Sequence, residues 1–139
     1  MCNMMQKKAK FSGFLLMSLN TEKRETAYLL GRLFAVLEKA QLDALGKINT
    51  TIKDRYFSAA ASTPASVFPR LLQLSQHHIG KAEYGSISDK RIGEIMEHIE
   101  SFPPHIDLQD QGLFAIAYYQ QKNEIYRKKT DVTEGENHE

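Results

Sequence analysis

The sequence predicts an all-α protein, a single compact bundle of about five helices. Apolar residues recur three and four positions apart through most of the chain, sustained alternation of period two is absent, and β-branched residues are sparse. A length of 139 residues suits one domain with its own hydrophobic core. We expect an N-terminal extension over residues 1–20, the helical bundle over 21–128, and a disordered acidic tail over 129–139.

The first helix is predicted from about Thr21 to Leu45. Asn20 or Thr21 would cap its start, and Gly46 would end it. Its apolar face consists of Leu30, Leu33, Phe34, Leu37, Ala40 and Ala44.

A short second helix follows from about Thr51 to Ala61, and Thr63 with Pro64 opens the third. Pro69 should interrupt that third helix, with a short turn and a new start there, because proline removes a backbone donor. The apolar arc that follows is Leu71, Leu72, Leu74, Ser75, His78, Ile79 and Ala82.

The fourth helix is predicted from about Ser88 to Phe102, ended by two prolines. The fifth begins near Asp107, which is a good capping residue, and runs to about Arg127. Its segment Leu113–Tyr119 is apolar or aromatic at every position. A helix that is apolar all round is normally enclosed, so we expect this one at the centre of the bundle.

Charge and cysteine content restrict the classes of function. The chain has 18 basic and 17 acidic residues, a formal net charge of +1, so any nucleic-acid-binding surface must be local. The single Cys2 excludes a disulfide framework and favours a reducing compartment, hence a cytoplasmic protein.

The N-terminus resembles a signal peptide, with lysines before the apolar run Phe11–Leu19. This run is shorter than the roughly 20 apolar residues that span a bilayer, and no cleavage site follows it. We therefore expect no membrane insertion, and an amphipathic leader or a poorly ordered start instead.

No pattern in the sequence indicates a catalytic residue, a metal site or a cofactor. Adjacent His77 and His78 would point about 100° apart on a helix, and no two histidines lie four residues apart. His78 is better explained as a hydrogen-bonded core residue. The sequence contains no nucleophile elbow, and Asp107 and Asp110 suit a helix cap better than an acid pair. We interpret the chain as non-enzymatic.

The third helix carries the best candidate binding surface. Five residues fall on one strip opposite its leucines and include no acid, and we call them the basic strip: Arg70, Gln73, His77, Lys81 and Tyr84. Phosphates bind cations and amide donors, and unpaired bases stack on aromatic rings. The alternative is an ordinary solvated helix face, although such a face usually mixes in Asp and Glu.

Further cations lie on the first two helices. Lys53 projects into an otherwise apolar arc with Arg55 at its edge, so its stem either covers apolar surface or places the ammonium group against an anion. Arg32 and Lys39 share a face with Glu25 and Asp43, and pairing within the helix would explain both cations.

Three phrases resemble one known family: AYLLGRLFAVLEKAQ (27–41), TIKDRYFSAAASTPASVFPRLLQLSQHH (51–78) and DQGLFAIAYYQQ (110–121). They are similar to the C-terminal helical domain of the large subunit of the type I-C CRISPR surveillance complex (Cascade, Csd family). The resemblance covers residues 20–127. A free-standing copy of this domain serves there as the small subunit, and it is helical.

The resemblance implies a non-catalytic small subunit that bridges the backbone and large subunits. Its expected partners are those subunits, other copies of itself and target DNA, chiefly the displaced strand and also the crRNA–DNA hybrid, without sequence preference. The DNA-contacting candidates are then Lys53, Arg55, Arg70, Gln73, His77 and Lys81. The alternatives are a C-terminal fragment of the large subunit, a purely structural bridge without DNA contact, and an enzyme.

Overall fold

The computed structural model describes residues 18–82 and 85–137, with side chains as far as Arg127. Five α-helices and no strand make up this part, which confirms the predicted all-α class. The helices are α2 (Thr26–Leu45), α3 (Ile52–Ser62), α4 (Pro64–Lys81), α5 (Gly85–Met96) and α6 (Leu108–Asn137). Cys2 and most of the expected leader lie outside the described residues, and the proposed domain division stays a prediction.

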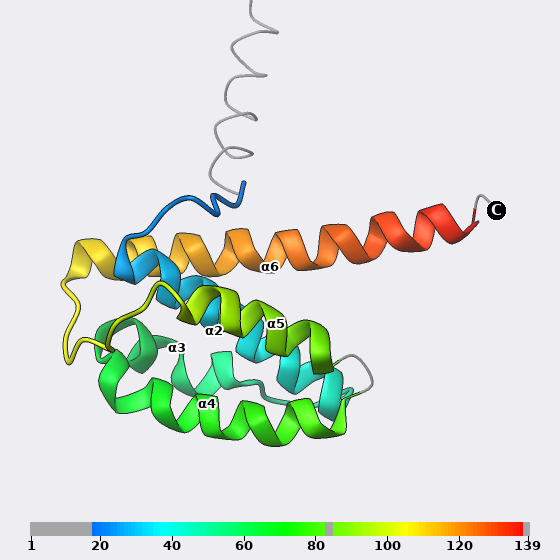
Figure 1. The fold of residues 1–139 in the computed structure, drawn as a ribbon. Coiled ribbons are helices and arrows are strands. Elements are labelled where there is room, and N and C mark those ends of the chain that lie inside the picture. The colour runs from blue at the N-terminus through cyan, green and yellow to red at the C-terminus, as the bar shows by residue number, and fades with distance from the viewer. Residues whose placement is uncertain (1–17, 83–84, 138–139) are drawn as a thin grey trace, which may run out of the picture.

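Helix α2 is the centre of the fold, because it contacts each of the other four described helices. α4 and α6 lie on opposite sides of it (Figure 1), and they meet through the rings of Phe68 and Phe114, whose centroids are 6.4 Å apart, rather than through close approach of their backbones. The expectation that α6 would be central is therefore wrong. Ile116 and Tyr119 on α6 are 39% and 46% exposed, because α6 packs along one side of the bundle and leaves its other face open.

A cluster of aromatic rings fixes the helices around α2. The ring of Phe34 lies edge-on to those of Phe57, Phe68, Phe114 and Tyr118, with centroids 5.6–6.4 Å apart. These partners come from α3, α4 and α6, so one side chain of α2 contacts three other helices. Edge-to-face contacts of this kind add to the stabilisation from burial.

Two of the predicted helix starts are confirmed by their capping geometry. Thr51 caps α3 by accepting from the backbone N–H of Lys53, while the Asp54 carboxylate accepts from the N–H of Thr51. Asp107 caps α6 through its side chain, which accepts from the N–H of Asp110 at 2.8 Å.

The start of α2 differs from the prediction, which placed the cap at Asn20 or Thr21. The helix begins at Thr26 after Glu25, whose side chain makes no capping hydrogen bond. Asn20 instead accepts from the N–H of Glu22 in a turn, and its own N–H donates to the hydroxyl of Tyr28. Burial of α2 from Ala27 onward, rather than a local cap, sets this end.

Helix α4 continues through Pro69, so the predicted interruption there is wrong. The ring of Pro69 is exposed, while Phe68 and Leu71 on either side are buried against the core. Packing of these neighbours outweighs the one backbone hydrogen bond that proline cannot make.

The last two helices differ from the prediction in their ends. Helix α5 begins and ends before the expected 88–102, yet Ile99 and Phe102 beyond it still pack against the core. Helix α6 does not end near Arg127 but continues to Asn137, across the segment for which disorder was expected, and it extends beyond the other helices (Figure 1).

Candidate nucleic-acid interface

The basic strip lies on the solvent side of α4. Arg70, Gln73, His77 and Lys81 are all exposed, and Tyr84 lies outside the described residues. Val67, Phe68, Leu71, Ser75 and His78 form the opposite, buried face of the same helix. No Asp or Glu occurs anywhere in α4. The helix therefore presents cations and polar groups to solvent without an intervening negative charge.

None of the four described strip residues has a hydrogen-bonding or ion-pairing partner within the described part of the chain. Their donors remain available to phosphate oxygens, which accept from cations and amides. This differs from Lys39, which pairs with Asp43 as predicted for that helix face.

Lys53 lies at the seam between α3 and α6. Its ammonium nitrogen is 5.9 Å from the ring centroid of Phe57, 6.0 Å from that of Tyr118 and 5.6 Å from that of Tyr119. The side chain is half-buried, so its stem covers apolar surface while the charge lies against aromatic faces. Arg55 is exposed on α3.

Tyr119 is a candidate that the sequence prediction missed. Its ring is 46% exposed beside Lys53, which gives a cation and an open aromatic face together. Bases of single-stranded nucleic acid bind such combinations. The residue was assigned to the core because it falls in an uninterrupted apolar run. Only the one-sided packing of α6 identifies it as a surface residue.

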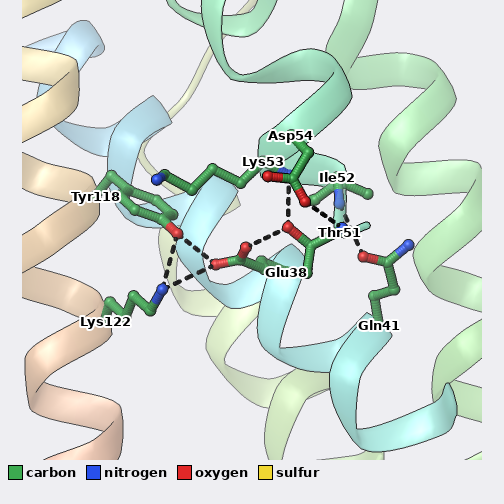
Figure 2. A network of polar contacts seen from close by, with 8 residues as sticks. All are labelled: Glu38, Gln41, Thr51, Ile52, Lys53, Asp54, Tyr118 and Lys122. Carbon is green, nitrogen blue, oxygen red and sulfur yellow. Dashed lines mark hydrogen bonds and ion pairs between the residues drawn. The ribbon is translucent and has the colours of Figure 1, made fainter. Parts of the chain in front are cut away.

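A polar network next to Lys53 joins α2, α3 and α6 (Figure 2). The buried carboxylate of Glu38 accepts hydrogen bonds from the hydroxyl of Tyr118 and, at 2.8 Å, from that of Thr51. Lys122 lies 3.7 Å from the same carboxylate and donates to the Tyr118 hydroxyl at 3.3 Å. Burial, together with the bond to Glu38, raises the pKa of Tyr118 above its ordinary value. The network positions the start of α3, and with it Lys53.

The basic strip and the Lys53–Tyr119 pair are separate features. The basic strip lies on the exposed face of α4, and the Lys53–Tyr119 pair lies at the seam between α3 and α6. Helix α3 contacts both α4 and α6, so its surface is one route by which a nucleic acid could touch both features.

The four histidines within the described residues show no metal-binding arrangement. In the described residues no three His, Cys, Asp or Glu side chains lie close enough to hold an ion. His77 is exposed, whereas His78 is buried, as predicted, with its ring centroid 6.3 Å from that of His77. The ring of His78 makes no hydrogen bond within the described residues, so the expectation that it would be hydrogen-bonded is wrong. Burial, then the charges of His77 and Lys81, lower the pKa of His78.

Arg32 does not pair with an acid of its own helix, so that prediction is wrong. Its Nε–H donates to the side-chain oxygen of Gln121 on α6 at 2.9 Å, and the side chain is only 9% exposed. Burial lowers its pKa. The sequence offered no signal for this, since Arg32 and Gln121 lie far apart along the chain.

One family of known proteins matches most of this chain. No described helix has the length and apolar content needed to cross a membrane. A search of curated proteins finds no match to the chain. A family model described as CRISPR-associated protein (Cas_Csd1) matches residues 2–126, which extends the similarity into the N-terminal segment that the resemblance had left out. The chain therefore belongs to the Cas_Csd1 family of CRISPR-associated proteins.

Proposed function

We propose that this chain is the non-catalytic small subunit of a type I-C CRISPR RNA-guided surveillance complex. In this role it bridges the guide-binding backbone and the large subunit, and it holds the displaced DNA strand of the R-loop in antiviral defence in the cytoplasm. It binds protein and nucleic acid and catalyses no reaction. Membership of the Cas_Csd1 family supports the context.

The single observation that favours DNA contact is the basic strip on α4, which is exposed, unpaired in the described structure and free of acids. Exchange of a DNA duplex for an RNA–DNA hybrid is nearly balanced in free energy, so a few phosphate contacts can shift it. A chain of net charge +1 would bind DNA weakly alone, and avidity within the complex would supply the rest. Lys53, Arg55 and Tyr119 would add contacts on the second feature.

Reconstitution of the surveillance complex with and without this chain tests the proposal. Permanganate reactivity of thymines reports which part of the displaced strand is unpaired. We expect the chain to co-purify with the complex and to extend the reactive region. If it neither co-purifies nor changes the opening, the proposed function is wrong.

A charge-reversal pair then tests the contact surface. Arg70→Glu with Lys81→Glu should weaken R-loop formation while the variant still folds and assembles. Lys47→Glu with Lys90→Glu changes the net charge equally at exposed positions elsewhere and should leave opening unchanged. Normal opening with the first pair would refute the role of the basic strip and favour a purely structural bridge.

A further inference from the structure

Arg32 carries a positive charge into the interior of the fold without an acidic partner. Its only hydrogen bond in the described structure joins Nε to Gln121, and no carboxylate oxygen there lies within 4.0 Å of its nitrogens. Removing a guanidinium from water costs several kcal/mol unless a counter-charge replaces the solvent. Arginine stays protonated, so it does not avoid this cost by losing its proton.

Arg32 lines a cavity of about 320 Å³ that is bounded by α2, α5, α6 and the segment before α2. Every described side-chain nitrogen that is sealed from solvent has a hydrogen-bonding partner. Since the terminal nitrogens of Arg32 have none, they must be open to this cavity. Liquid water occupies about 30 Å³ per molecule, so the space holds a small polyatomic ion with ordered water.

Two more arginines line the same cavity from different helices. Arg91 on α5 is half-buried and has no ion pair or hydrogen bond in the described structure. Arg127 on α6 is more exposed and pairs with Glu124 at 2.6 Å. Two acids, Glu94 and Glu124, also line the cavity, so the arginines exceed the acids there.

The charges around Arg32 leave its own charge uncompensated. Burial has the largest effect on the pKa of Arg32 and lowers it, and the charge of Arg24 lowers it further. Tyr28 raises this pKa, and Glu94 also raises it but has the smallest effect of the four. Glu94 also lines the cavity, but its side chain is exposed and forms no ion pair in the described structure. An anion inside the cavity would meet Arg32 and Arg91 directly.

We propose that this cavity is an anion site whose ligand is a phosphate group of a nucleic-acid backbone. A tetrahedral phosphate accepts from several directions, which suits guanidinium groups arriving from three helices, and the arginine fork matches its oxygens. The identity of the ligand rests on the function proposed above. The site lies between α2, α5 and α6, apart from the basic strip on α4.

Thermal unfolding of the full chain in inorganic phosphate, at constant ionic strength set by sodium chloride, tests the site. Phosphate at about ten times its Kd should raise Tm saturably by about 5 °C. Arg91→Gln with Arg127→Gln should lose most of this increase. Lys47→Gln with Arg55→Gln removes the same charge at exposed positions that do not line the cavity, and should keep it. The paired variants also separate binding from the general stabilisation that phosphate exerts by exclusion from protein surfaces.

Two further measurements test whether the anion binds next to Arg32 and whether nucleic acid is the natural ligand. The Nε–Hε resonance of Arg32 in the wild-type chain should shift on phosphate titration, which needs no substitution at this buried position. Fluorescence anisotropy with a labelled single-stranded oligothymidylate should show binding about tenfold weaker for Arg91→Gln with Arg127→Gln.

The outcomes distinguish an anion site from none, and a nucleic-acid ligand from an acidic protein group. Equal phosphate stabilisation of the wild type and the arginine variant, with no shift at Arg32, would overturn the site. Loss of the phosphate effect with unchanged oligonucleotide affinity would overturn nucleic acid as the ligand and favour an acidic group of a protein partner. These measurements use the isolated chain, so failure of the chain to join a surveillance complex is a separate result that refutes the proposed function alone.

Discussion

Replacement of Gly31 by alanine should force α2 and α6 apart. A Cβ at this position would lie 2.2 Å from the carbonyl oxygen of Phe114 and 2.8 Å from the Cβ of Ala117. Ordinary contacts begin at 3.4 Å, so α6 would have to move by roughly 1 Å. Because the nearest atom belongs to the backbone of a helix, no change of rotamer relieves the clash. We expect a loss of about 3 kcal/mol, the upper part of the range for overpacked cores.

Urea denaturation followed by circular dichroism measures this loss, and in thermal unfolding it corresponds to a decrease in Tm of roughly 12 °C. Gly93→Ala is the matched control, since Gly93 is exposed within α5 and a Cβ there meets nothing within 4 Å. That substitution should stabilise the chain by about 0.5–1 kcal/mol, because alanine favours the helix over glycine. A Gly31→Ala variant as stable as the wild type would refute the close approach of the two helices.

Three other substitutions test the polar groups of the fold. Glu38→Gln should lower the free energy of unfolding by about 2 kcal/mol, because each carboxylate oxygen accepts from one hydroxyl and one of these oxygens becomes an N–H donor. Tyr118→Phe should then cost less in the Glu38→Gln background than it does alone, as urea titrations of the double-mutant cycle will show. The pKa of His78 is lowered in the folded chain, so the unfolded chain binds a proton more readily and stability is lost as the pH falls below about 6.5. His78→Gln should therefore reduce the fall in Tm between pH 7.5 and pH 5.5. The control substitution His98→Gln, at an exposed position, should leave that fall unchanged. Lys53→Met should leave the free energy of unfolding within about 1 kcal/mol of the wild-type value. It should reduce the slope of log binding constant against log salt concentration for single-stranded DNA by about 0.7. An unchanged slope would show that Lys53 does not contact the DNA.

Local sequence determined the elements whose signals are local. The capping residues Thr51 and Asp107 begin α3 and α6 as predicted, because a cap acts on the backbone within three residues of it. The exposed face of α4 also followed from helical periodicity, which places Arg70 and Lys81 opposite the buried Phe68 on any regular helix.

Proline at position 69 shows where local rules were overruled. The sequence predicts a break, yet burial of the flanking side chains keeps α4 continuous, and burial depends on which helices lie next to it. The apolar run on α6 likewise predicted a central helix, and this was wrong. Composition does not tell how many sides of a helix are covered by its neighbours.

The sequence by itself determined that this chain is helical, where most helices lie, and that α4 carries a face of cations without acids. Only the tertiary structure decided that α2 is central, that Tyr119 is exposed beside Lys53, and that Arg32 enters a cavity with arginines from α5 and α6. Helix formation and capping depend on neighbours a few residues away. The centre of a bundle and the counter-charge of a buried arginine depend on segments that meet only when the chain is folded.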